Sequence, residues 1–261
     1  MPDSTMYAYQ PDSLEGKVSD AEWQTRVDMA VCYRIAYHFG WNDTIHNHLS
    51  ARVPDDPEKF VMNPQGLGWH EMTASSLIKA DFKGNDYNKS EFRLAPAGRN
   101  FHSAILELRP DINCVFHIHP MASVVVSATR DGLLPLDQNS AMLYGRVSYH
   151  DYEGLADEAD EGPRIVEHLG ANQHMIMWNH GLLTVGRTVA EAMANMHALA
   201  RCCETQMHTL ALNRPIELVP EEICKKAKDK IYERYQGQPG GSLEFKAYRR
   251  LAEKLDPSYR T

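Results

Sequence analysis

The sequence predicts an α/β protein, because short runs of β-type residues alternate with amphipathic stretches of helical period along most of the chain. The chain has 261 residues, enough to bury a sizeable core, and its 43% hydrophobic and 24% charged residues are ordinary for a globular protein. It contains no internal repeat and no convincing linker. We therefore expect one domain over residues 19–213, a loose polar arm over residues 1–18, and a C-terminal helical extension of the same domain over residues 214–261.

The expected helices are marked by capping residues and by apolar side chains at helical spacing. Ser19 and Glu22 form a capping box ahead of a helix that ends near Gly40, and Thr188 with Glu191 starts a long helix in the same way. The apolar stripe of that long helix is rich in methionine, which is typical of a core or of a subunit interface. Shorter helices are expected over residues 73–80, 98–108, 121–128 and 154–169.

The expected strands are short apolar or alternating runs bounded by turn residues. The turn Asn179-His180-Gly181 joins the last two of them. The strands cover residues 49–53, 59–62, 114–119, 133–136, 146–149, 174–178 and 182–185.

Charge, hydropathy and cysteine content exclude several classes of protein. The formal net charge is −8 and the basic residues are dispersed up to the C-terminal tail, which argues against a nucleic-acid partner. No apolar run approaches the roughly 20 residues that a membrane span needs, and the N-terminus has no secretory signal pattern. The five cysteines are scattered and odd in number, so they predict no disulfide framework. We therefore expect a cytoplasmic protein without a membrane partner.

Two histidines one residue apart, His117 and His119, mark the most informative segment, Val115-Phe116-His117-Ile118-His119-Pro120. Alternate side chains of a strand share a face, so these two imidazoles project together while the residues between them point into the opposite layer. A third histidine, His180, arrives from the distant Asn179-His180-Gly181 turn. Three nitrogen ligands that leave a coordination position open are typical of a catalytic metal site.

Several motifs of the chain, in their order and spacing, resemble those of the class II aldolase/adducin family. This family includes fuculose-phosphate and ribulose-phosphate aldolases and the adducin head domain. The resemblance extends from about residue 22 to residue 206. Its anchors are Asn63-Pro64-Gln65-Gly66, residues 73–77, His102, Arg109-Pro110-Asp111, His117-Ile118-His119-Pro120 and Asn179-His180-Gly181-Leu182-Leu183.

The resemblance implies a three-layer α/β fold in which a central, mainly antiparallel sheet is flanked by helices. It also implies a homotetramer with active sites at subunit interfaces and one divalent metal ion per subunit. The ligands carried over to this sequence are His117, His119 and His180. Zinc is the metal we expect first, with manganese or iron as alternatives, because histidine nitrogens accept all three.

The resemblance further implies a general base beside the metal and a pocket for the substrate. Glu71 is the expected base, and its neighbour His70 is the alternative. The segments that correspond to the family's phosphate cradle lack compact donors for a phosphate, which argues against a phosphorylated sugar. Gln138 and Asn139 stand where the sugar-phosphate enzymes carry a proton-donating tyrosine, so that donor is missing or comes from Tyr144, Tyr149 or another subunit. We expect substrate contacts from His48, Ser50, Asn63, Gly66, Gln138 and Asn139.

The expected function is that of a metal-dependent carbon–carbon lyase acting on a non-phosphorylated small molecule. The reaction is retro-aldol cleavage of a hydroxy or oxo acid, or decarboxylation of an oxo or aromatic acid. Two alternatives stay open. A three-histidine site also suits iron and oxygen, which favours a non-haem oxygenase, and the family includes adducin-like scaffolds that are not enzymes.

Overall fold

A seven-stranded sheet forms the centre of the molecule, with strand order β3-β2-β1-β4-β7-β6-β5. The computed structural model describes residues 9, 11–88, 90–154, 160–235 and 237–261. Every neighbouring pair of strands is antiparallel except β5 and β6, which confirms the expected mainly antiparallel α/β fold. The strands are β1 (His48–Val53), β2 (Asp56–Met62), β3 (Ile78–Asp81), β4 (Cys114–Ile118), β5 (Val147–His150), β6 (His174–Met177) and β7 (Gly181–Gly186).

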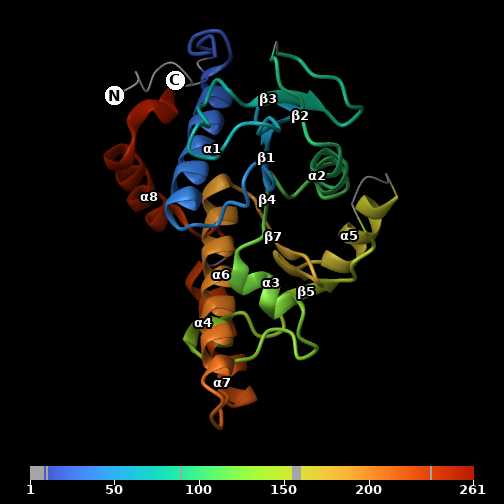
Figure 1. The fold of residues 1–261 in the computed structure, drawn as a ribbon, viewed down its shortest axis with the longest axis vertical. Coiled ribbons are helices and arrows are strands. Elements are labelled where there is room, and N and C mark those ends of the chain that lie inside the picture. The colour runs from blue at the N-terminus through green and yellow to red at the C-terminus, as the bar shows by residue number, and fades with distance from the viewer. Residues whose placement is uncertain (1–8, 10, 89, 155–159, 236) are drawn as a thin grey trace.

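Helices cover both faces of this sheet (Figure 1). Helices α1, α6 and α8 lie on one face and α2 and α5 on the other, so that the molecule has three layers. The short helix α3 packs against α6, and α4 packs against α7. The helices are α1 (Asp20–His38), α2 (Pro96–Leu108), α3 (Met121–Ser127), α4 (Gln138–Met142), α5 (Glu161–Leu169), α6 (Val189–Ala211), α7 (Glu221–Tyr235) and α8 (Ser242–Leu255).

The alternation of side chains along β4 produces two separate hydrophobic cores. Phe116 and Ile118 enter the core beneath α1 and α6, whereas Val115 enters the core beneath α2 and α5. His117 follows the parity of Val115 and contacts Phe101 of α2, with ring centroids 5.3 Å apart. The expectation that the two β4 neighbours of His117 point away from it is therefore confirmed.

The N-caps of the two long helices are those expected from the sequence. The Ser19 hydroxyl accepts from Glu22 N and the Thr188 hydroxyl accepts from Glu191 N. The two glutamates do not reach back to their caps as a capping box requires, because their carboxylates bind Arg26 and Arg187 instead. The methionines of α6 that are fully buried, Met193 and Met196, pack into the core of their own chain.

The prediction of a helix over residues 73–80 is wrong. Residues 74–76 form a turn, and β3 begins directly afterwards. The backbone N–H groups of Ala74 and Ser75 donate to the carbonyl oxygens of Tyr259 and Thr261, at 2.9 and 2.8 Å. These donors are committed to the C-terminal end of the chain, which the local sequence does not reveal.

The prediction of a strand over residues 133–136 is also wrong. The N–H of Leu133 donates to the hydroxyl of Tyr149, and that of Leu134 donates to the side-chain oxygen of Gln206. Pro135 has no N–H to offer a neighbouring strand. β3 and α4 were not predicted from the sequence. Part of the helix expected over residues 154–169 lies outside the described residues.

The C-terminal segment packs against the main domain. Phe245 and Ala252 of α8, together with Tyr259, are buried in the core that contains α1 and α6. None of the helices in the described part of the chain combines the length and apolar character that a bilayer-spanning segment requires. All five cysteines are free and buried.

Candidate metal centre

His117 and His119 stand at the C-terminal end of β4, the central strand of the sheet. His117 pairs with His48 of β1 on one side and with Leu183 of β7 on the other. His119 follows the strand directly, just before Pro120 caps α3. Because β4 has hydrogen-bonded neighbours on both sides, the backbone under His117 is held firmly in place, and His119 comes two residues later.

His180 reaches the same place from the turn between β6 and β7. Asn179 adopts φ of +55°, in the left-handed region that asparagine tolerates better than most residues. Its N–H donates to Ser127 O, which ties the turn to the end of α3. At Gly181 an added Cβ would lie 2.5 Å from Ile118 O and 2.8 Å from His119 Cδ2. The glycine therefore allows β7 to approach the end of β4 closely enough for the three histidines to meet.

The three imidazoles converge on one point. Their ring centroids are 4.6 to 4.7 Å apart in all three pairs, and one candidate ligand atom from each residue lies within 4.8 Å of the other two. The Nε2 atoms of His117 and His119 are 2.7 Å apart. Among the described residues, these three form the group of His, Cys, Asp and Glu side chains that is compact enough to hold a metal ion.

Polar contacts at the outer nitrogens favour one tautomer of each ring. His117 Nδ1 is 2.9 Å from Leu182 O, which can only accept, so Nδ1 carries the proton. His119 Nδ1 lies 3.4 Å from the Asp43 carboxylate, which favours the same tautomer. Both Nε2 atoms then present lone pairs to each other across 2.7 Å. Two facing lone pairs repel, and a cation bound to both nitrogens offsets the repulsion, so this donor set fits a metal ion.

Burial keeps the three ligands neutral. It lowers the pKa of His117 well below the usual value, and the nearby His119 and His180 lower it further. Burial is also the main reason why the pKa of His180 falls to about 4. That of His119 is also lowered by burial, although Asp43 opposes the shift. A neutral imidazole has the free lone pair that a metal requires.

Two further histidines lie behind the three ligands. The ring of His48 stacks on that of His117, with centroids 5.3 Å apart, and burial lowers the pKa of His48 to about 3. His102 of α2 packs against His48, and its Nδ1 is 2.6 Å from the hydroxyl of Ser50. An added Cβ at Gly98 would lie 2.6 Å from His48 Cδ2. The glycine on α2 therefore makes room for the His48 ring.

Residues 27–207 match the family described as Class II Aldolase and Adducin N-terminal domain. The chain belongs to this family. A putative aldolase class 2 protein of Pseudomonas aeruginosa is 42% identical over 252 residues, covering 96% of this chain and 97% of the relative. An aldolase II superfamily protein from Pseudomonas syringae superimposes with a TM-score of 0.89 at 38% identity, over 96% of this chain and all of the other. An L-fuculose 1-phosphate aldolase from Glaciozyma antarctica superimposes with a TM-score of 0.81 at 25% identity, over 97% of each chain.

Three residues expected to bind substrate occupy the neighbourhood of β1 and β2. Ser50 is fully buried and its hydroxyl is engaged with His102. The Asn63 side-chain oxygen accepts from the Tyr33 hydroxyl and its amide donates to Asn47 O, at 2.8 and 3.3 Å. Gly66 lies on an exposed turn with φ of +114°. The polar groups of Ser50 and Asn63 are thus occupied by contacts within the chain.

The expected base lies in the loop between β2 and β3. Glu71 is half-buried, and its carboxylate accepts from Gly68 N at 2.7 Å. His70 is exposed and its ring lies 4.9 Å from that of Tyr37. Among the contacts described for this part of the chain, none joins either side chain to the three histidines. The choice between Glu71 and His70 stays a prediction.

Gln138 and Asn139 lie on α4, and Asn139 lines a cavity elsewhere in the molecule. Two residues near the histidines were not predicted from the sequence. Asp43 lies behind His119, and the ring centroid of Tyr152 is 6.1 Å from that of His180. The signal for Asp43 was the Trp41-Asn42-Asp43 loop, which precedes the strand that pairs with β4. No local pattern marked Tyr152.

Proposed function

We propose that this protein is a divalent-metal-dependent carbon–carbon lyase. The observation that carries the proposal is the convergence of three imidazoles, with the Nε2 atoms of His117 and His119 2.7 Å apart and His180 completing the set. A divalent ion held by these nitrogens supplies Lewis-acid chemistry, which stabilises the negative charge that a substrate develops when a C–C bond breaks. Zinc is the first expectation, with manganese and iron as alternatives.

The surrounding residues hold the ligands and exclude water. Leu182 O and Asp43 orient the rings of His117 and His119, as the outer contacts of metal-bound histidines do. The neutral ring of His48 covers the inner side of His117. Glu71, or alternatively His70, takes the substrate proton. Tyr152, half exposed and with its ring centroid 6.1 Å from that of His180, is the candidate to return a proton to the carbon that leaves.

The substrate we propose is a non-phosphorylated hydroxy or oxo acid, or an aromatic acid, cleaved by retro-aldol reaction or decarboxylation. Tight phosphate binding needs several free donors aimed at one point. In the segments that correspond to the family's phosphate cradle, the Ser50 hydroxyl and the Asn63 amide are already engaged within the chain. The Asn47 side-chain nitrogen and His48 Nδ1 have no partner among the described residues, but both atoms are buried. This internal bonding favours a substrate without a phosphate group.

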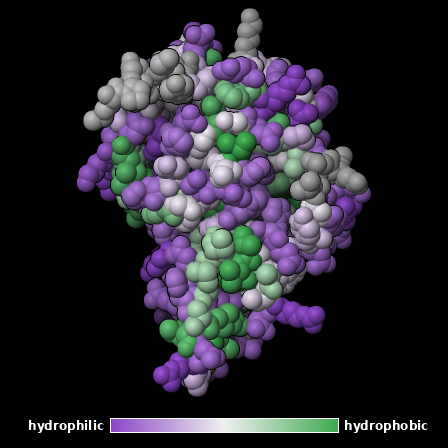
Figure 2. Space-filling model, viewed as in Figure 1, coloured by the Kyte–Doolittle hydropathy of each residue, from purple (hydrophilic) through white to green (hydrophobic). Residues whose placement is uncertain are grey.

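We also propose that the protein is a homo-oligomer, with a tetramer as the expected form. Figure 2 shows apolar side chains gathered over α3 and, further along the same face, near α7. On α3, Met121 is 74% exposed and Val125 38%. Between α6 and α7, Leu212 is 69% exposed and Leu218 45%. Contiguous apolar surface of this kind is typical of subunit interfaces, and light scattering at micromolar concentration tests the assembly.

The lyase proposal is tested by elemental analysis together with turnover on panels of hydroxy and oxo acids, with and without oxygen. His119→Ala should lose the metal and the activity. His208→Ala is the matched control, because His208 is an exposed histidine on the same chain. It should retain both.

Two outcomes would overturn the proposal. Iron together with strict dependence on O₂ would make the protein an oxygenase. If neither the parent protein nor the His208→Ala variant holds a metal, and the parent turns over no substrate, the protein belongs with the non-enzymatic adducin-like scaffolds.

A further inference from the structure

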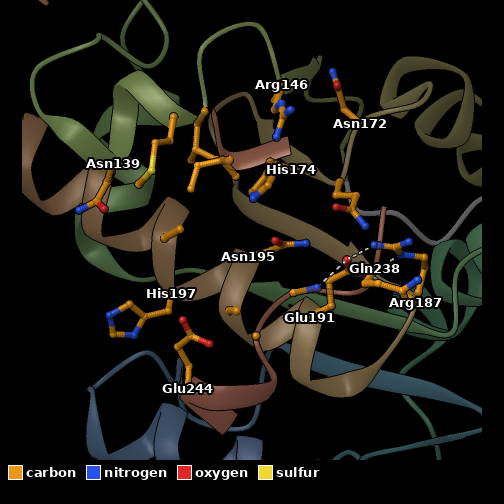
Figure 3. Close-up of a pocket in the computed structure, with 18 of the residues that line it drawn as sticks. Asn139, Arg146, Asn172, His174, Arg187, Glu191, Asn195, His197, Gln238 and Glu244 are labelled. Carbon is orange, nitrogen blue, oxygen red and sulfur yellow. Dashed lines mark hydrogen bonds and ion pairs between the residues drawn. The ribbon is translucent and has the colours of Figure 1, made fainter. Parts of the chain in front are cut away.

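A cavity of about 890 Å³ lies between α4, α6, the start of β6 and the connection from α7 to α8 (Figure 3). This volume is within the range of about 300–1,000 Å³ that is usual for small-molecule sites. The described residues that line it include both polar groups and an apolar wall, the latter formed by Met142, Leu143, Ala194, Ala198 and Tyr248.

The cavity and the three histidines lie at opposite ends of the strands β6 and β7. The register pairs His174, at the start of β6, with Thr184 near the end of β7, and pairs Met177 with Gly181 next to His180. The cavity is lined by His174 and by Arg187, just after β7 ends. It is therefore separate from the candidate metal centre, and its occupant does not depend on the proposed reaction.

His174 is the unexplained residue of this cavity. Its side chain points into the cavity beside Asn195 (Figure 3). The residue is only 6% exposed, and neither ring nitrogen has a hydrogen-bond partner among the described residues. Burial lowers its pKa to about 4, helped by the charge of Arg146. The ring is thus neutral, with one N–H to donate and one lone pair, and leaving both buried and unpaired is costly.

Arg146 is an arginine of the lining that no carboxylate among the described residues pairs; the unpaired carboxylate of the lining, Glu244, lies on the other side of the cavity beside His197 (Figure 3). The other arginines on the lining are paired: Arg109 with Asp111, Arg187 with Glu191 and Arg201 with Glu204. The contact described for the Arg146 guanidinium is a long hydrogen bond, 3.5 Å, to Lys228 O. In Figure 3 Arg146 projects above His174 on the same side of the cavity.

We propose that this cavity binds a small molecule that carries an oxyanion, either a carboxylate or a phosphate, on an apolar body. The guanidinium of Arg146 offers a planar fork that matches such a group, and the N–H of His174 donates to it from the buried side. Asn195 donates its amide to Val185 O, which leaves its side-chain oxygen for a hydroxyl of the ligand. The apolar wall takes the remainder of the ligand.

Calorimetry on the full chain with three probes tests the proposal: inorganic phosphate, succinate and phenyl phosphate. At least one oxyanion should bind saturably, and phenyl phosphate should bind more tightly than inorganic phosphate because its ring reaches the apolar wall. The first two probes separate a phosphate site from a carboxylate site. The His119→Ala variant should bind the same probe with unchanged affinity, because this cavity does not use the metal. Loss of binding in that variant would assign the anion to the metal centre and overturn the proposal.

Two arginine variants complete the test. Arg146→Gln should weaken binding by about tenfold to a hundredfold, the usual loss for a charge-assisted hydrogen bond. Arg214→Gln is the matched control, since Arg214 is exposed and does not line the cavity. It should bind as the parent does. Equal affinities of the two variants would refute the proposed site. So would the absence of saturable binding of every probe at concentrations up to about 10 mM.

Discussion

Replacing Asp43 with asparagine tests whether the carboxylate behind His119 contributes to metal binding. Outer partners of metal-bound histidines are worth about tenfold to a hundredfold in affinity. Here the Asp43 oxygen is 3.4 Å from His119 Nδ1, longer than a normal hydrogen bond, and the carboxylate is 48% exposed. We therefore expect the lower end of that range, about a tenfold weaker affinity, which corresponds to about 1.4 kcal/mol.

Competition with a chelator of known affinity measures this loss. Asp229→Asn is the matched control, because Asp229 is an exposed aspartate on α7. The fold of both variants should be unchanged by circular dichroism. An affinity equal to that of the control would show that Asp43 does not orient His119. A loss far above a hundredfold would mean that Asp43 itself binds the ion.

Two further substitutions test the loop and the turn beside the metal centre. Glu71→Gln should keep the metal and lower turnover by a factor of about 10² to 10⁴, with His70→Gln much milder; steady-state kinetics that give the opposite order would make His70 the base. Gly181→Ala should lower the free energy of unfolding by about 1–3 kcal/mol and weaken metal binding, because its Cβ would crowd Ile118 O and the ring of His119. Unchanged urea unfolding together with unchanged chelator competition would contradict that steric account.

The parts of the fold that the sequence predicted are those specified by local pattern. The apolar period and the cap at Ser19 predicted α1, and the alternation around His117 predicted which β4 side chains share a face. Both features depend on residues within a few positions of one another. Family resemblance added the long-range part, the arrival of His180 beside His117 and His119.

The errors occurred where distant segments take over the hydrogen bonds of a local pattern. The segment after Thr73 resembles a helix start, but Ala74 and Ser75 donate to the end of the chain, more than 180 residues away. The expected substrate contact of Asn139 stays a prediction, and α4 places this residue on the cavity that His174 also lines. That cavity is assembled from five separated stretches of chain, so no single motif could have predicted it.

The buried cysteines give the native chain internal reporters of local opening. Burial raises the pKa of the thiols of Cys32 on α1, Cys114 on β4 and Cys202 on α6. Because the thiolate is the form that alkylates, each should react at neutral pH only when its element opens. Alkylation rates, followed by peptide mass spectrometry, then compare the helical layer with the strand that carries His117. A bound metal should slow the reaction of Cys114 more than that of Cys202, since it stabilises the closed end of β4 first.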